Sequence, residues 1–154
     1  MFTNILVPVD GNPDAEAAIP IAAEIAKKFG AAVLLLEVNP AYGQIMGATA
    51  AESFGASGSV QAAAEVAAAA ESAAGAYLEA LRVRYGTPEW KTVVAEGDSS
   101  TAIVEQAKKS GTDLIVMATH ARSGLKRLFL GSVSEDVIRH ANIAVLVVHS
   151  NDQP

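Results

Sequence analysis

The chain contains no cysteine among its 154 residues. This absence excludes disulfide bonds, thiolate zinc sites, iron–sulfur clusters and a thiol nucleophile. The first ten residues also lack the basic stretch that precedes the apolar run of a secretory leader. Since neither a leader nor a disulfide framework suggests export, the sequence predicts a cytoplasmic protein.

Basic residues and long apolar runs are also scarce. The chain has 11 lysines and arginines against 17 aspartates and glutamates, which gives a net charge of -6. This balance speaks against a general nucleic-acid or anionic-membrane binder. The most apolar runs are too short to span a bilayer, and three glutamates interrupt the alanine-rich stretch 61–80. We therefore expect no nucleic-acid partner and no membrane association.

Apolar residues, by contrast, are abundant, at 51% of the chain against 18% charged residues. This composition excludes a disordered chain, and the length predicts a single domain over residues 1–150 with a tail over 151–154. Within the domain, four glycines scattered among alanine and serine predict a long mobile loop over 39–59.

Short apolar runs alternate with helical patterns along the chain. Strands are predicted over 3–9, 31–38, 90–95, 113–118 and 143–149, and helices after Pro13 and over 60–84, 98–109 and 132–141. The alternation indicates an α/β fold with an open, five-stranded parallel sheet covered on both faces. Asn12 is the expected cap of the first helix, Asp98 is that of a later helix, and Pro20 is expected to bend the first helix.

Two of the predicted strand ends carry residues suited to a ligand. In open parallel sheets, ligands bind beyond the carboxyl ends of the strands. Asp10 follows the first strand, and a basic loop with Arg122 and Lys126 follows the fourth. That loop runs to Gly131 and Ser132, where a helix N-terminus offers free N–H groups and a positive dipole end. These features predict a phosphate site.

The residues alone leave a second interpretation of this segment open. The sequence from Ser132 to Glu135 is S-x-x-E, which is the pattern of a helix capping box. The chain also lacks the G-x-x-x-x-G-K-[ST] loop and the G-x-G-x-x-G turn of common nucleotide folds. Phosphate binding and a purely structural helix start therefore both fit the residues.

Several segments together resemble the universal stress protein family. They are residues 4–11 (NILVPVDG), 96–98 (EGD), 113–127 (DLIVMATHARSGLKR), 130–135 (LGSVSE) and 144–148 (AVLVV). The resemblance spans essentially the whole chain and implies a Rossmann-like sheet with strand order 3-2-1-4-5. It also implies a homodimer that pairs through the last strand, residues 143–149 with Ile143 and His149 at its ends. An apolar edge strand of this kind invites pairing with a second chain.

The resemblance further implies an adenine-nucleotide site, with ATP as the ligand. Asp10 would approach the nucleotide or its Mg²⁺, Val38 would meet the adenine through its backbone, and Gly97 would line the site. No residue is assigned a catalytic role. The implied binding residues are Pro8, Val9, Asp10, Val38, Gly97, Ala118, Thr119, His120, Ala121, Arg122, Ser123, Gly124, Gly131, Ser132, Val133 and Ser134.

The sequence departs from the family's ATP-binding pattern at two positions. That pattern is G-x-x-G, nine residues, then G-[ST]; Gly131 and Ser132 fill its end, but Ala118 and Ala121 replace its first glycines. If the backbone φ is positive there, each alanine costs on the order of 1 kcal/mol.

Three hypotheses follow from this departure. The first is an ATP-binding, dimeric regulatory module for stress adaptation. The second is a dimeric protein-interaction module that does not bind ATP tightly and acts through a regulatory protein partner. The third is a slow Mg²⁺-dependent ATP hydrolase. We rank the hydrolase last because no base or nucleophile has an evident partner in the sequence.

Overall fold

A computed structural model of the chain describes residues 1–40, 56–119 and 131–150. All five predicted strands and the predicted helices are present, with ends that shift by a few residues. The elements in chain order are β1 (Asn4–Val9), the 3-10 turn η1 (Ala15–Ala17), α1 (Ala18–Phe29), β2 (Ala32–Asn39), α3 (Ala56–Tyr85), β3 (Lys91–Glu96), α4 (Ser99–Lys109), β4 (Leu114–Thr119), α5 (Ser132–His140) and β5 (Ala144–His149).

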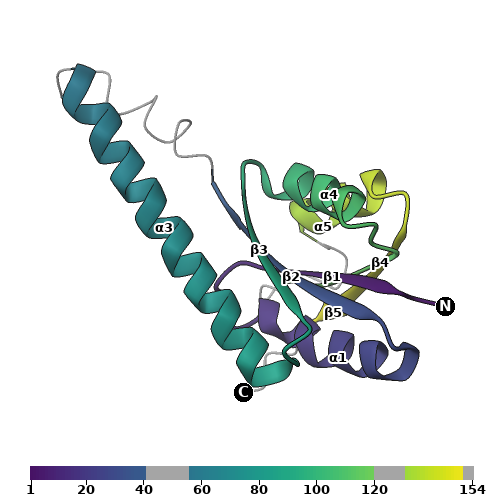
Figure 1. Cartoon of the computed structure of the whole chain (residues 1–154). Helices are drawn as coiled ribbons and strands as arrows, with labels where there is room; N and C mark the ends of the chain where they lie inside the picture. The colour runs from purple at the N-terminus through teal and green to yellow at the C-terminus, as the bar shows by residue number, and fades with distance from the viewer. Residues whose placement is uncertain (41–55, 120–130, 151–154) are drawn as a thin grey trace.

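The five strands form one parallel sheet in the order β3-β2-β1-β4-β5. Helices α1 and α3 lie on one face of the sheet, and α4 and α5 lie on the other (Figure 1). This arrangement confirms the predicted fold class and strand order. It places β1 and β4, where the strand order reverses, side by side at the centre of the sheet.

The central strands are buried on both faces, as their nearly continuous apolar sequences predict. In β1, Ile5 and Val7 join the core under α1 and α3, whereas Leu6 joins the core under α4 and α5. This alternation follows from the two-residue period of a strand. The sheet therefore separates two apolar cores, and each core fixes the position of the helices on its own face.

The pairing between β1 and β4 is much shorter than the other pairings in the sheet. Only Ile5 with Leu114 and Leu6 with Ile115 are in register, whereas β1 pairs with β2 over six positions. The Asn4 carbonyl accepts the Asp113 N–H at 3.0 Å, so the backbone polar groups of Asn4, Leu6 and Pro8 face β4. Because Pro8 has no N–H, it cannot continue this ladder, and the pairing ends before it.

The first helix begins later than the sequence predicts. Asn12 does not cap an α-helix; its Oδ1 accepts the Asp14 N–H at 3.2 Å and its carbonyl accepts the Ala15 N–H at 3.0 Å, which starts the 3-10 turn η1. The α-helix begins only at Ala18. Pro20 is thus in its first turn, where the missing N–H would have no intrahelical partner.

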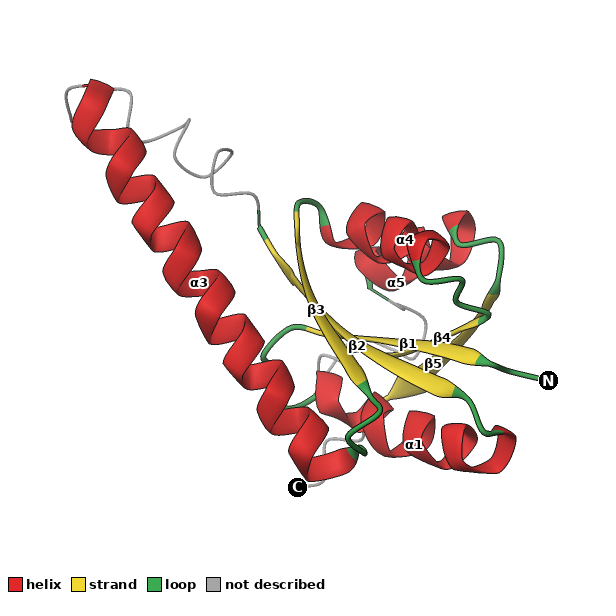
Figure 2. Ribbon diagram, in the orientation of Figure 1, coloured by secondary structure: helices red, strands yellow, loops and turns green. Residues whose placement is uncertain are grey.

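Helix α3 is 30 residues long and begins at Ala56, inside the loop predicted over 39–59. Asn39 belongs to β2, so the predicted loop is too long at both of its ends. The buried side chains of α3 are Ala74, Leu78 and Leu81 in its second half, which packs on β2 and β3. The first half of the helix extends past the sheet (Figure 2). No helix in the described part of the chain is long and apolar enough to cross a membrane.

Gly86, at the end of α3, gives a direct test of packing. A Cβ built at Gly86 would lie 2.5 Å from the Trp90 ring. Gly86→Ala is therefore expected to lower the free energy of unfolding by about 1–3 kcal/mol, measured by urea denaturation. Gly75→Ala is the matched control. Gly75 lies inside α3 and a Cβ there meets open space, so this variant is expected to gain about 0.5–1 kcal/mol. Equal stabilities of Gly86→Ala and the unmodified chain would contradict the packing.

Candidate functional site

The carboxyl edge of the sheet brings together residues that are far apart in the sequence. Asp10 follows β1, Gly97 follows β3, and Thr119 ends β4. The Gly97 N–H donates to the Asn39 carbonyl at 2.9 Å, which joins the ends of β2 and β3. Gly97 has a φ of +125°, a conformation that favours glycine. This edge is thus organised by the backbone, and it includes the ends of the two central strands.

Asp10 starts the turn after β1 and is exposed. Its Oδ1 accepts the Asn12 N–H at 3.0 Å, so the carboxylate helps to form the turn. Asp10 therefore has a structural role in this turn. The same exposure leaves the carboxylate accessible from solvent at the edge where the ligand was predicted.

Pro8, Val9 and Val38 contribute their backbones to this edge and their side chains to the core. Pro8 and Val9 are buried, and Val9 packs in the core under α1 and α3. Val38 is half-buried and packs against the core under α4 and α5. Any contact between Val38 and a ligand must therefore be made by its backbone groups.

The start of α5 differs from a capping box. The N-cap residue is Gly131, with φ 80° and ψ 147° and no side-chain cap hydrogen bond, so Ser132 is already inside the helix. The Gly131 carbonyl accepts the Glu135 N–H at 3.0 Å, which is the first helical hydrogen bond. The alternative in which Ser132 caps the helix is therefore wrong, because a capping box requires its serine at the N-cap position.

The first turn of α5 presents N–H donors that no described residue accepts. The N–H groups of Ser132, Val133 and Ser134 have no acceptor among the described residues. Ser132 and Val133 are exposed, whereas Ser134 is buried, at 4% of its exposed area. Such N–H groups, together with the positive end of the helix dipole, suit an anion.

Ala118 lies within β4, where it pairs with Val148. Asn142 is the sole non-glycine residue with positive φ in the described part of the chain, so φ at Ala118 is negative. The strain that a positive φ would impose on this alanine is therefore absent. Thr119 follows with 3% exposure, and its Oγ1 lies 3.1 Å from Nδ1 of His149, which makes Thr119 a link between β4 and β5.

Part of the predicted site lies outside the described residues. This part comprises His120, Ala121, Arg122, Ser123 and Gly124, together with the cations Lys126 and Arg127. Within the described ranges, no group of three or more histidine, aspartate or glutamate side chains is placed to hold a metal ion. A Mg²⁺ at Asp10 would thus need oxygens from the ligand itself, as Mg²⁺ commonly takes from phosphates.

Glu37 is a residue of this region that the sequence analysis did not single out. It lies in β2 in register with Val9, on the face that carries Val33 and Leu35. Its Oε2 is buried and has no hydrogen-bond partner among the described residues. Burial, with a smaller contribution from Asp10, raises the pKa of Glu37 above its usual 4.5. The sequence feature that could have identified Glu37 is an acidic residue inside an otherwise apolar strand.

Glu37 has acidic and phenolic groups as electrostatic neighbours. Tyr77 on α3 donates its hydroxyl to Oε1 of Glu16 at 3.2 Å. Burial and the charges of Glu16, Glu37 and Asp10 raise the pKa of Tyr77 far above its ordinary value. The turn after β1, the end of β2 and the second half of α3 therefore share one cluster of acidic groups, in which Arg84 pairs with Glu16 at 3.7 Å.

Comparison with known proteins gives one consistent result. The family model described as the universal stress protein family matches residues 1–149. Universal stress protein MJ0531 of Methanocaldococcus jannaschii is 34% identical over 156 residues, which cover 96% of this chain and 82% of that protein.

Solved structures agree with the sequence relatives. The structure of MJ0577, also from Methanocaldococcus jannaschii, has a TM-score of 0.77 and 25% identity, with 99% of each chain covered. A universal stress protein crystallised in complex with cAMP shares the fold, with a TM-score of 0.62, 20% identity and coverage of 97% of this chain and 98% of that one.

The carboxylate oxygen of Glu37 that is buried without a described partner predicts a pH-dependent stability. A raised pKa means that the folded state holds the proton more tightly than the unfolded chain. The stabilisation is complete below pH 4.5 and is lost as the pH rises through the raised pKa. Glu37→Gln is therefore expected to melt at a higher temperature than the unmodified chain at neutral pH, with the gain shrinking as the pH falls towards 4.5.

The control for this measurement is Glu65→Gln, which changes an exposed glutamate on α3. Thermal melts followed by circular dichroism at several pH values give both comparisons. A gain for Glu37→Gln that is the same at every pH, or equal to that of the control, would contradict the assignment.

Proposed function

Because the chain belongs to the universal stress protein family, we propose that it binds an adenine nucleotide at the carboxyl edge of its sheet. ATP is the proposed ligand, and regulation during stress adaptation is the proposed role. The composition supports a cytoplasmic location for this role. The proposal rests above all on Gly131 and the first turn of α5.

The phosphates are proposed to bind at the N-terminus of α5. Gly131 adopts a backbone conformation that an L-residue with a side chain rarely reaches, and three N–H groups follow it without a described acceptor. Hydrogen bonds from these N–H groups and the helix dipole both favour an anion. The hydroxyl of the exposed Ser132 is an additional donor at the same place.

The base and ribose are proposed to extend along the ends of β1 and β2. The register of β1 with β4 ends at Leu6, and Pro8 has no N–H to donate to β4. The backbone of Val38 and the turn at Gly97 border the adjoining edge. Asp10, exposed after β1, is proposed to meet a Mg²⁺ that the phosphates bring with them.

Alanine at position 118 is compatible with this proposal. Its negative φ and its place in β4 mean that the methyl group is accommodated by an ordinary strand conformation. The interaction-module hypothesis rests on a methyl group at Ala118 and at Ala121 in place of glycine. Backbone strain at Ala118 no longer favours it. Nucleotide binding is therefore the function that the described geometry supports best.

The direct test is identification of small molecules released by denaturing freshly purified protein, using mass spectrometry. About one equivalent of ATP per chain is expected, as is typical of a tight site that survives purification. Release of a different adenine nucleotide would support the proposed site and replace ATP as its ligand. No nucleotide, followed by no heat signal on titration with Mg-ATP, would leave the dimeric interaction module as the function.

Gly131→Val tests the site assignment itself. The variant forces a β-branched residue into a φ of 80° and crowds the proposed phosphates, so ATP affinity is expected to fall at least about tenfold in calorimetry. Gly30→Val is the matched control, because Gly30 also has a positive φ, 68°, but ends α1 at the opposite edge of the sheet. Unchanged affinity in a folded Gly131→Val protein would remove this helix start from the site.

We also propose that the protein forms a homodimer through β5, the exposed edge strand of the sheet. Leu146 retains 37% of its exposed area, and the strand is apolar from Ala144 to Val148. The Ser150 N–H donates to Thr119 at 3.4 Å, so the N–H groups of Val148 and Leu146 also point to β4. The N–H of Val147 therefore points away from the sheet, towards a second strand.

Val147→Pro is expected to convert this dimer into a monomer, because it removes an outward N–H while leaving the ladder to β4 intact. Light scattering at micromolar concentration measures the mass. Leu146→Pro is the comparison variant, and it should destabilise the fold by breaking the β4 ladder. A monomeric mass for the unmodified chain, or an unchanged dimer for Val147→Pro, would refute pairing through β5.

A further inference from the structure

In the described ranges, all lysines and arginines lie at the amino edge of the sheet. Each helix runs back against the parallel strands, so the helix C-termini meet at the edge where the strands begin. Lys91 begins β3, and the other cations are in the last turns of the helices: Lys27, Lys28, Arg82, Arg84, Lys108, Lys109 and Arg139. The described part of the carboxyl edge, by contrast, carries carboxylates and neither lysine nor arginine. Charge is therefore segregated along the strand direction.

Four of these cations lie on the face of the sheet that α4 and α5 cover. Lys108 and Lys109 end α4, and Arg139 is in the last turn of α5, which packs against α4. Lys91 is in register with Leu34 of β2, which packs against the core under α4 and α5. The Lys91 side chain therefore leaves the sheet on the same face. We call Lys91, Lys108, Lys109 and Arg139 the basic ridge.

The basic ridge runs across the starts of the strands. Lys91 begins β3 on one side of the sheet, α4 ends just before β4, and α5 ends just before β5 on the other side. Four strand spacings of about 4.8 Å separate β3 from β5, so the ridge is roughly 19 Å long. An extended peptide rises about 3.3 Å per residue, and about six residues therefore cover this length.

The charge of the basic ridge is available to a partner. All four of its side chains belong to exposed residues. The ion pairs within the described ranges join Arg82 to Glu79 and Arg84 to Glu16, and none of them involves the ridge. The C-termini of α4 and α5 each offset about half a positive charge, which leaves the ridge positive.

The carboxylates around α4 and α5 do not neutralise the basic ridge. Asp113, which precedes β4, is held by the start of β1. Its Oδ2 accepts the Thr3 N–H at 2.8 Å and the Thr3 hydroxyl at 2.7 Å, and its Oδ1 accepts the Asn4 N–H at 3.1 Å. Glu105 on α4 and Asp136 on α5 lie about one turn further from the edge, and neither is in an ion pair with the ridge. The ridge therefore favours an anionic partner.

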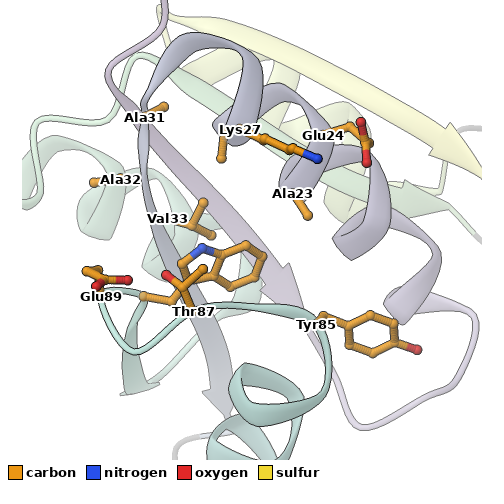
Figure 3. A pocket seen from close by; sticks show the side chains of 11 residues that line it. Ala23, Glu24, Lys27, Ala31, Ala32, Val33, Tyr85, Thr87 and Glu89 are labelled. Atoms are coloured by element: carbon orange, nitrogen blue, oxygen red, sulfur yellow. The ribbon is translucent and has the colours of Figure 1, made fainter.

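The other face of the amino edge carries charges of both signs. A cavity of about 510 Å³ lies there, between the end of α1 and the connection from α3 to β3. Glu24 and Glu89 border this cavity together with Lys27, as Figure 3 shows. A flat anionic surface that rested on the whole edge would thus meet carboxylates as well as cations, whereas a narrow partner confined to the ridge would not.

From these features, we propose that the basic ridge is the docking surface for an extended acidic segment of a partner protein. Carboxylates of the segment pair with the four cations while its backbone crosses the starts of the strands. A nucleic acid fits less well, because nucleic-acid-binding domains are usually basic overall and this chain has a net charge of -6. The ridge is opposite to the edge proposed for the nucleotide, so this inference goes beyond the proposed function.

Hexaglutamate labelled with fluorescein is the probe, and labelled hexaglutamine is its matched counterpart. Fluorescence anisotropy is expected to show saturable binding of hexaglutamate alone, with an affinity that falls at least about tenfold between about 20 and about 200 mM salt. The full chain is used without nucleotide, so the outcome is independent of the proposed function. No saturable binding of hexaglutamate, or equal binding of both peptides, would overturn the proposal. Tighter binding of a hexathymidylate oligonucleotide, or of vesicles with about 30% phosphatidylserine, would also overturn it.

Two double variants with the same change in net charge locate the site. Lys108→Gln with Lys109→Gln removes two cations of the ridge, and hexaglutamate is expected to bind about tenfold more weakly at about 0.1 M salt. Lys27→Gln with Lys28→Gln removes two cations from the end of α1, on the other face. Here the affinity is expected to change less than about twofold, because charges beyond about 10 Å are screened at this salt concentration. Thermal melts check that both variants fold, and equal losses of affinity in the two would refute the ridge as the site.

Discussion

The missing N–H of Pro8 limits the pairing of the two central strands, and much of the carboxyl edge depends on that limit. Pairing of β1 with β4 stops at Leu6, although both strands continue for several residues. A central strand normally pairs along its whole length, because unpaired buried N–H and carbonyl groups are costly. A proline at this position removes one of the groups that would need a partner. The register of the two central strands therefore ends before the carboxyl edge, at the point where the strand order reverses.

The two edges of the sheet are built from different chemistry. At the carboxyl edge, the main features belong to the backbone: the conformation of Gly131, the N–H groups that begin α5, and the turn at Gly97. At the amino edge, the features belong to side chains, above all Trp90, which is buried and lies against Gly86. The helix dipoles reinforce this contrast, since α5 presents a positive end to the first edge and α1 a negative end to the second. The carboxyl edge is therefore the edge whose backbone favours an anion.

Some residues of the carboxyl edge are not there for stability. Glu37 places a carboxylate oxygen without a described partner under α3, where an apolar residue would cost less. Gly131 loses more conformational entropy on folding than any other residue type would at the same place. Ala118, in contrast, carries no such cost, because an ordinary strand conformation accommodates its methyl group. Local departures from stability of this kind are typical of functional edges.

The sequence by itself determined the elements, the parallel sheet, the Asp98 cap, whose side chain accepts the Thr101 N–H at 3.0 Å, and the family. These features are encoded by local periodicity, capping chemistry and a distinctive run of residues. They can therefore be recognised without knowing which residues contact one another in the fold. Only the tertiary structure decided that Gly131 and not Ser132 caps α5, that Pro8 ends the β1–β4 ladder, and that Ala118 is unstrained. Each of these depends on a backbone conformation or on a partner more than a hundred residues away. Local sequence patterns do not record such relations.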